Sequence, residues 1–101
     1  MSQTHEPGAL DRAALERMFH RMAVTRAIER VMARHVREEK FSGWWHPGEG
    51  QEAAGIGATA ALRSDDYVWY QGRGCSWAIG KGMAPGRILG DLLGKVTCSA
   101  R

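Results

Sequence analysis

A histidine, two tryptophans and several glycines stand close together in the middle of this chain. His46 follows Trp44 and Trp45 and comes directly before the glycine-rich segment 47–50. The imidazole is the side chain that gains and loses a proton near neutral pH, and aromatic neighbours exclude water around it. The segment therefore suits proton transfer or hydrogen bonding to a ligand. A turn capped by aromatic residues is the alternative interpretation, and these residues alone leave both open.

A second candidate for chemistry is Arg73, which lies between Gly72 and Gly74 just after the aromatic run 67–70. Glycine permits close approach of the backbone, and a guanidinium group binds phosphate through two parallel hydrogen bonds. We therefore predict an anion-binding corner here. An ordinary arginine in a surface turn is the alternative.

Four further residues are expected to have structural roles. Gln51 and Glu52 fall at the start of a predicted helix, where their side chains meet unpaired backbone N–H groups. We interpret Glu52 as structural rather than catalytic. Arg26 and Glu29 stand three residues apart, and this spacing predicts a structural ion pair on one helix face.

The elements that hold these residues are predicted to be mostly helical. Residues 67–70 read as the one short strand, because they are β-branched and aromatic. Apolar spacing, small residues and end signals predict helices over 11–40, 51–62, 75–81 and 85–94. Part of the apolar stripe of the first helix is expected to face another subunit. One strand cannot make a sheet, so the chain either lacks the rest of an α/β domain or folds mainly as packed helices.

Composition excludes several classes of protein. The chain has 101 residues, 44% hydrophobic and 25% charged, which are ordinary globular values. Its formal net charge of +3 is mild and the basic residues are mixed with acids, which disfavours nucleic-acid binding. The apolar runs are too short to cross a membrane. Cys75 and Cys98 are too far apart for a CxxC motif and are expected to be free thiols. The histidines lack zinc-site spacing, so no metal site is predicted.

The N-terminal residues carry no signal for secretion. The segment 1–7 has no positive charge followed by an apolar core. We therefore expect a cytoplasmic protein, with residues 1–10 disordered and residues 11–101 forming one portion of a domain.

An ordered series of motifs resembles one family. In chain order they are Arg26-x-x-Glu29, Gly43-x-x-His46-x-x-x-Gly50-Gln51-Glu52-Ala53, Leu62-Arg63-x-Asp65-Asp66-Tyr67, Arg73-Gly74 with Gly82-Met83, and Leu93-Gly94-Lys95. Over residues 12 to 97 they resemble the N-terminal part of the alpha subunit of the thiamine-diphosphate-dependent dehydrogenase component of 2-oxo acid dehydrogenase complexes. Its members act on pyruvate, branched-chain 2-oxo acids or acetoin. Each motif alone is weak, and their order makes the resemblance specific.

The resemblance implies a fold, a cofactor and roles for particular residues. The fold would be the N-terminal fragment of a doubly wound α/β thiamine-diphosphate-binding domain. His46 would be catalytic, Arg73 and Tyr70 would bind the cofactor, and Gln51 and Glu52 would shape the helix start beside the site. The reaction would be oxidative decarboxylation of a 2-oxo acid, or cleavage of acetoin, with acyl transfer to a lipoyl carrier.

The resemblance also implies partners. A beta subunit would pair with this chain, typically as two alpha and two beta chains, and a lipoyl-bearing acyltransferase would receive the acyl group. Thiamine diphosphate and Mg²⁺ would be the cofactors. The family's Gly-Asp-Gly segment, which helps to hold magnesium and diphosphate, does not occur here, so metal ligands are absent and the bare chain is expected to be a truncated, inactive alpha subunit.

Two further departures bear on the site. Cys75 stands where the family usually has a histidine, and Tyr70 is separated from Arg73 by two residues. A different class of function is the alternative interpretation: a non-catalytic helical module that binds a partner protein and is indifferent to thiamine diphosphate.

Overall fold

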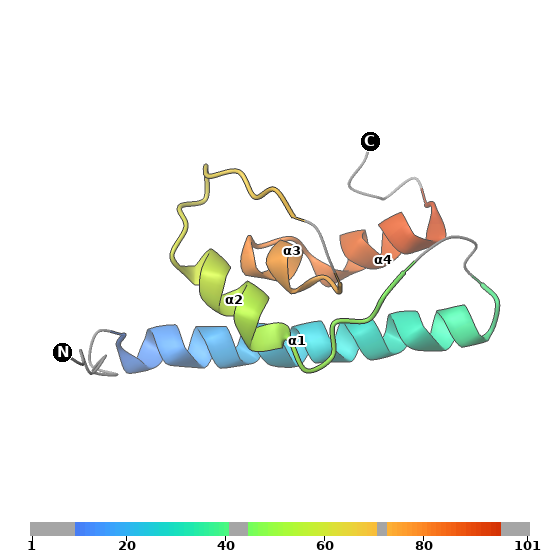
Figure 1. The fold of residues 1–101 in the computed structure, drawn as a ribbon, viewed down its shortest axis with the longest axis horizontal. Helices are drawn as coiled ribbons and strands as arrows, with labels where there is room; N and C mark the ends of the chain where they lie inside the picture. Colours follow the sequence, from blue (N-terminus) through green and yellow to red (C-terminus); the bar gives the residue numbers. More distant parts are fainter. Residues whose placement is uncertain (1–9, 41–44, 71–72, 96–101) are drawn as a thin grey trace.

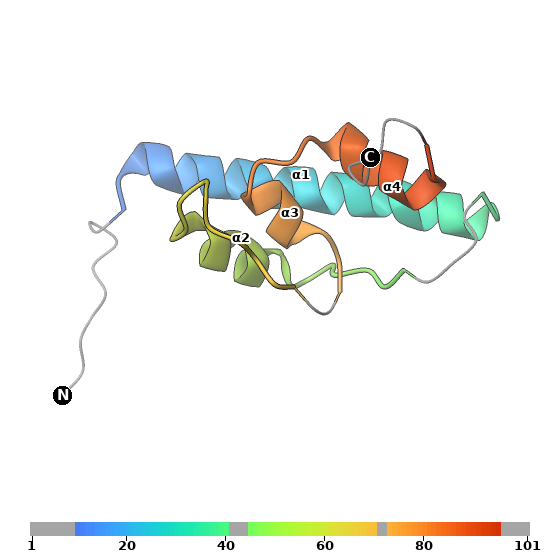
Figure 2. The same ribbon diagram turned by 90° about the horizontal axis from the view of Figure 1, so that it is seen from above.

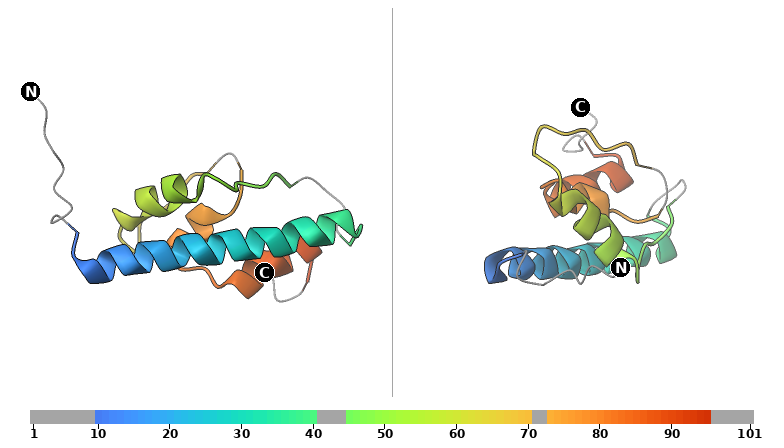
Figure 3. Two further views of the ribbon diagram at one scale, coloured as in Figure 1. Left: turned by 90° about the horizontal axis from the view of Figure 1, so that it is seen from below. Right: turned by 60° about the vertical axis from the view of Figure 1, so that its left-hand side comes forward.

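The computed structural model describes residues 10–40, 45–70 and 73–95. One long helix runs the length of the molecule, and three shorter helices lie along one side of it (Figure 1). The elements are α1 (Arg12–Arg37), α2 (Glu52–Ala60), α3 (Ser76–Gly80) and α4 (Pro85–Leu93). Seen from above, α2 and α4 flank the long helix, with α3 between them (Figure 2). All three short helices contact α1, and α2 also packs on α3 (Figure 3).

The long helix is shorter at its C-terminal end than the predicted 11–40. It begins after Asp11, whose carboxylate accepts a hydrogen bond from the backbone N–H of Ala14 at 2.7 Å. It ends at Arg37, and Glu39 then takes a positive φ of 58°, which stops helical hydrogen bonding. The buried face of the described helix consists of Thr25, Ile28, Glu29 and Met32. This face is the stripe that holds the rest of the fold.

The N-terminal part of the predicted apolar stripe is only partly covered by the described residues. Leu15 is 44% exposed and Phe19 is 73% exposed, whereas Met18 and Met22 of the same stripe pack against the core. A partner on this face remains an expectation.

Glycines allow α2 and α3 to pack closely, as the small residues of α2 predicted. A Cβ placed on Gly55 would lie 1.9 Å from the Ser76 hydroxyl oxygen, and one on Gly80 would lie 1.9 Å from the Thr59 hydroxyl oxygen. Gly57 faces open space, so packing among the described residues does not require a glycine at this position. The close contact between α2 and α3 thus depends on Gly55 and Gly80.

The structure confirms a mostly helical chain and corrects the predicted strand. Residues 67–70 are not in a strand, and the described residues contain none. A strand needs a neighbour to complete its hydrogen bonds, and no described segment lies beside this one to provide it. Tyr67 and Trp69 are almost fully exposed, at 100% and 99%.

Some predictions fall outside the described residues. They include the disorder of residues 1–9, the side chain of Trp44, and the thiol of Cys98. Cys75 is a free, buried cysteine, as expected. No helix in the described ranges is both long and apolar enough to cross a membrane.

Candidate functional site

A buried glutamate attaches both predicted site loops to the long helix. Glu29 is 2% exposed, and one of its carboxylate oxygens accepts a hydrogen bond from the Gly48 N–H at 2.6 Å. The other oxygen accepts one from the Cys75 N–H at 2.9 Å and lies 3.7 Å from the Cys75 sulfur. Hydrogen bonds to a charged acceptor are about twice as strong as neutral ones. We call this arrangement the Glu29 clasp: Glu29 together with the backbone N–H groups of Gly48 and Cys75.

The two loops also contact one another directly. The Gly74 N–H donates to the carbonyl oxygen of His46 at 2.9 Å. A Cβ on Gly74 would lie 2.5 Å from the Glu29 carboxylate and 3.0 Å from the Gly48 Cα, and Gly74 has a φ of 77°. Both the backbone conformation and the space therefore require glycine at this position. The His46 loop and the Arg73 turn form one unit.

A second glutamate fixes the start of α2. The Arg26 guanidinium donates two hydrogen bonds to Glu52, at 2.5 and 2.9 Å, and the Gly50 N–H donates a third at 3.0 Å. The hydrogen bond from Arg26 is the main cause that lowers the pKa of Glu52 to about 2. This finding supports a structural interpretation of Glu52.

The predicted pairing of Arg26 with Glu29 is wrong. Both residues lie on α1 at a spacing that permits contact, yet the guanidinium turns to Glu52 on α2. Glu29 instead turns to the two backbone N–H groups of the clasp. Buried N–H groups need acceptors, and this need outweighs a local ion pair between Glu29 and the partly exposed Arg26.

Cys75, which the sequence resemblance sets where a histidine is usual, contributes its backbone N–H to the clasp. Burial is the main cause that raises the pKa of the Cys75 thiol to about 12, and the neighbouring Glu29 carboxylate also contributes to the rise. The thiol therefore stays protonated at neutral pH and donates weakly to Glu29. Its burial and its raised pKa both disfavour a role as a nucleophile.

Tyr70 reaches the Arg73 turn despite the two residues between them in sequence. Its hydroxyl donates to the Arg73 carbonyl oxygen, and its ring stacks on Trp77 with centroids 4.7 Å apart. Burial is the main cause that raises the pKa of Tyr70, with Glu29 and Cys75 contributing. The hydroxyl thus stays protonated and holds the backbone of the turn.

The predicted site residues are therefore distributed as follows. The side chains of His46 and Arg73 are exposed, and their backbones are joined through Gly74. Gln51 is exposed and makes no side-chain cap at the start of α2, so that part of its predicted role is not seen. Sequence reasoning missed the role of Glu29. The available signal was an acidic residue on the face of α1 that also carries Ile28 and Met32.

The described residues offer no metal centre. No group of three or more histidine, cysteine, aspartate or glutamate side chains in these ranges could hold a metal ion. They do offer one exposed guanidinium and one exposed imidazole, on loops held together by a buried carboxylate. Such an arrangement can bind an anion at the guanidinium group and present an imidazole ring on the adjoining loop.

Comparisons with known proteins place the chain in a family. The model of the dehydrogenase E1 component family matches residues 20–101. The mitochondrial pyruvate dehydrogenase E1 component subunit alpha of Chaetomium thermophilum is 33% identical over 81 residues, which are 80% of this chain and 20% of that protein. A probable mitochondrial pyruvate dehydrogenase E1 component subunit alpha from Caenorhabditis elegans is 30% identical over 89 residues, 86% of this chain and 22% of that protein. No solved structure matches the chain.

These relatives correct one prediction and fix the family. Both are mitochondrial proteins, which contradicts the cytoplasmic localisation expected above; that expectation rested only on the missing secretion signal. The chain spans about a fifth of the length of these curated relatives. The Glu29 clasp joins the two loops that carry the family's motif residues, and the family match covers both of them. The chain belongs to the dehydrogenase E1 component family.

Proposed function

We propose that this chain is the N-terminal part of an E1 alpha subunit and contributes His46 and Arg73 to a thiamine-diphosphate-dependent active site. The whole enzyme would decarboxylate a 2-oxo acid oxidatively and pass the acyl group to a lipoyl carrier. The observation that carries this proposal is the Glu29 clasp, which holds the two loops against α1. The family match and the pyruvate dehydrogenase relatives support the reaction class.

The residues present fit part of the cofactor. Arg73 has an exposed guanidinium on a turn that is fixed by backbone hydrogen bonds, which suits a phosphate oxygen. Mg²⁺ has no ligand set among the described residues, so we route no step through the metal. Bound thiamine diphosphate would supply a nucleophilic carbon for the chemistry on the 2-oxo acid.

Each residue of this chain then has its own task. Arg73 would hold the diphosphate through its guanidinium group. His46 gives or takes a proton at its imidazole ring beside that anion. Tyr70 holds the Arg73 turn through its carbonyl oxygen, and Glu52 holds the start of α2 with Arg26. Gln51 stands at the same helix start and shapes the approach to the site.

The exposed aromatic residues support partners for the chain. Tyr67 and Trp69 are almost fully exposed in an extended segment, and burying them requires another element. We propose that a strand of the complete α/β domain pairs with this segment. The exposed Phe19 on α1 would face the beta subunit, and the assembled enzyme would dock on a lipoyl-bearing acyltransferase.

Anion binding by Arg73 tests the proposal on the chain itself. Inorganic pyrophosphate and thiamine diphosphate are titrated into the chain by calorimetry, with Arg73→Gln as the variant and Arg87→Gln, an exposed arginine on α4, as the matched control. A hydrogen bond to a charged group contributes about 1.5–3 kcal/mol. We therefore expect Arg73→Gln to weaken binding at least tenfold and the control to leave it unchanged.

Two outcomes would overturn the proposal. Equal loss of binding in both variants would show general attraction to positive charge. A stably folded chain that binds neither pyrophosphate nor thiamine diphosphate would favour the non-catalytic interaction module. For His46, we expect His46→Ala to reduce turnover of the assembled dehydrogenase about 100-fold or more, with cofactor binding retained.

A further inference from the structure

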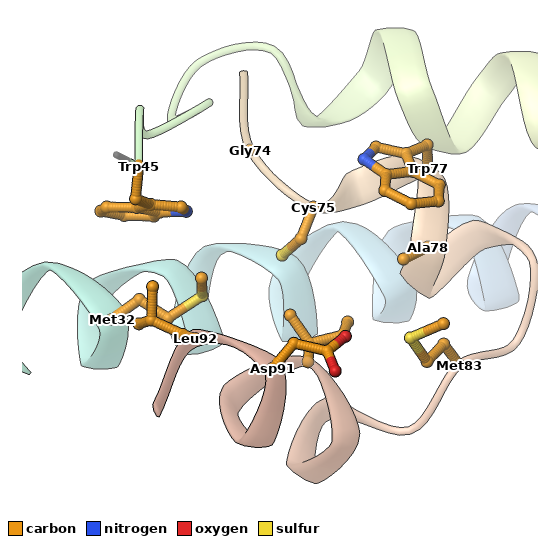
Figure 4. A pocket seen from close by; sticks show the side chains of 10 residues that line it. Met32, Trp45, Gly74, Cys75, Trp77, Ala78, Met83, Asp91 and Leu92 are labelled. Carbon is orange, nitrogen blue, oxygen red and sulfur yellow. The ribbon is translucent and has the colours of Figure 1, made fainter. Parts of the chain in front are cut away.

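A pocket opens beside the clasp, between α1, the start of the His46 loop, α3 and α4 (Figure 4). Its volume is about 300 Å³, at the small end of the range for sites that bind small molecules. Much of its lining is apolar, with side chains such as Met32, Ala78, Met83 and Leu92. The lining thus favours a compact apolar occupant.

Two buried hydrogen-bond donors in this pocket have no acceptor. The indole nitrogens of Trp45 and Trp77 are buried and, in the part of the chain that the structure describes, make no hydrogen bond. Both tryptophans line the same pocket. Figure 4 shows the nitrogen-bearing edges of the two rings turned toward one another. Buried tryptophan N–H groups usually find a partner, so an acceptor that reaches either nitrogen would remove an unfavourable feature.

The charges of the lining residues limit the kind of molecule that this pocket can bind. The one acidic side chain of the pocket is Asp91, and no arginine or lysine contributes to it. An anionic occupant would therefore lack a cation to pair with. A cationic occupant would meet the N–H edges of the indoles, which carry the positive end of the ring quadrupole, and the Asp91 carboxylate already takes part in an interaction within the chain. An uncharged molecule avoids both penalties.

We propose that this pocket binds a compact, uncharged molecule with an apolar body and a carbonyl-type hydrogen-bond acceptor. The acceptor receives a hydrogen bond from the Trp45 or Trp77 indole, and the body packs on Met32 and Met83. The site is separate from the exposed side chains of His46 and Arg73, neither of which lines the pocket. A test of this pocket is therefore independent of a test of the proposed cofactor binding.

Indole N–H signals in two-dimensional ¹H–¹⁵N NMR spectra report on the site directly. The 101-residue chain is titrated with cyclopentanone, with cyclopentane as the probe of matched shape without an acceptor, and with cyclopentanecarboxylate as the anionic probe. We expect cyclopentanone to shift the signals of Trp45 and Trp77 downfield and saturably, because a new hydrogen bond deshields the proton. The signal of Trp69, which is 99% exposed, should not move.

Variants separate a specific hydrogen bond from apolar partitioning. Trp77→Phe keeps an aromatic ring and removes the donor, and we expect it to weaken cyclopentanone binding about fivefold without affecting cyclopentane. Trp69→Phe is the matched control and should change neither. If the circular dichroism of Trp77→Phe shows that the variant has lost its helices, the proposal is tested by comparing the binding of cyclopentanone and cyclopentane to the unaltered chain. Any of three results would overturn the proposal: the indole signals show no saturable shift, the ketone and cyclopentane bind equally well, or the carboxylate binds more tightly than the ketone.

Discussion

Replacing Glu29 by glutamine should loosen the whole site, because this one carboxylate serves two buried backbone N–H groups. Glutamine has the same length but only one accepting oxygen. Its NH₂ group would face either the Gly48 or the Cys75 N–H, which now lie 2.6 and 2.9 Å from the carboxylate oxygens. One buried donor would then lose its acceptor, and the remaining hydrogen bond would lose its charge.

The magnitude follows from these two losses. An unsatisfied buried polar group costs about 1–3 kcal/mol, and loss of charge assistance costs about 1 kcal/mol more. We therefore expect Glu29→Gln to lower the free energy of unfolding by about 2–4 kcal/mol. Domains of this size have total stabilities of about 5–15 kcal/mol, so the loss is a large fraction of the whole.

Urea unfolding, followed by helical circular dichroism and by tryptophan fluorescence, measures this change. With a urea slope of about 1–2 kcal/mol per molar for a chain of this length, the midpoint should fall by about 2 M. Glu16→Gln is the matched control, because Glu16 lies on the same helix in an exposed pair with Arg12. Such pairs contribute about 0–1 kcal/mol. If the two variants shift the midpoint equally, the clasp does not hold the site.

Three further predictions follow from the same geometry. Gly74→Ala should lower the free energy of unfolding in urea by at least about 3 kcal/mol, because a Cβ at this position meets Glu29 and the backbone of the facing loop. Gly94→Ala is the control: Gly94 also has a positive φ but has open space around it, so the loss should be only about 1 kcal/mol. Arg26 lowers the pKa of Glu52 to about 2 in the folded chain. The Arg26–Glu52 pair therefore stabilises the fold fully above about pH 4.5, and this stabilisation is lost as the pH falls through about 2. We therefore expect the free energy of unfolding of Glu52→Gln to be about 1–2 kcal/mol below that of the unaltered chain at pH 6, after allowance for solvent screening, and the difference to be clearly smaller at pH 2.5. In a Cys98→Ser background, iodoacetamide at pH 8 should alkylate Cys75 at least 100-fold more slowly in buffer than in concentrated urea, since its thiol pKa is raised to about 12; equal rates would contradict the buried position.

Much of the secondary structure follows from local sequence. Helical spacing of apolar residues predicts α1, and the observed helix ends three residues earlier than predicted because Glu39 leaves the helical conformation. Pro85 and Gly94 mark the ends of α4 as predicted, since proline suits the first helical turn and glycine the left-handed residue that follows. Local rules suffice at these places because the deciding interactions lie within one or two turns.

The candidate site is less accessible to local reasoning. His46 and Arg73 stand out by their neighbours, and their roles remain predictions. The predicted partner of Arg26, Glu29, was wrong, because the observed acceptor, Glu52, lies 26 residues away in sequence on another helix. The strand predicted over residues 67–70 did not form, because a strand depends on a neighbour that the described residues do not contain.

The sequence by itself determined the helical character of this chain, the order of its family motifs and the residues that could do chemistry. These depend on side-chain type and on spacing along one element. Only the tertiary structure decided that Glu29 joins the two loops, that Cys75 is a buried and inert thiol, and that two indole N–H groups face one pocket. Those features arise where separate segments meet, and the need of buried polar groups for partners selects among pairings that spacing alone leaves open.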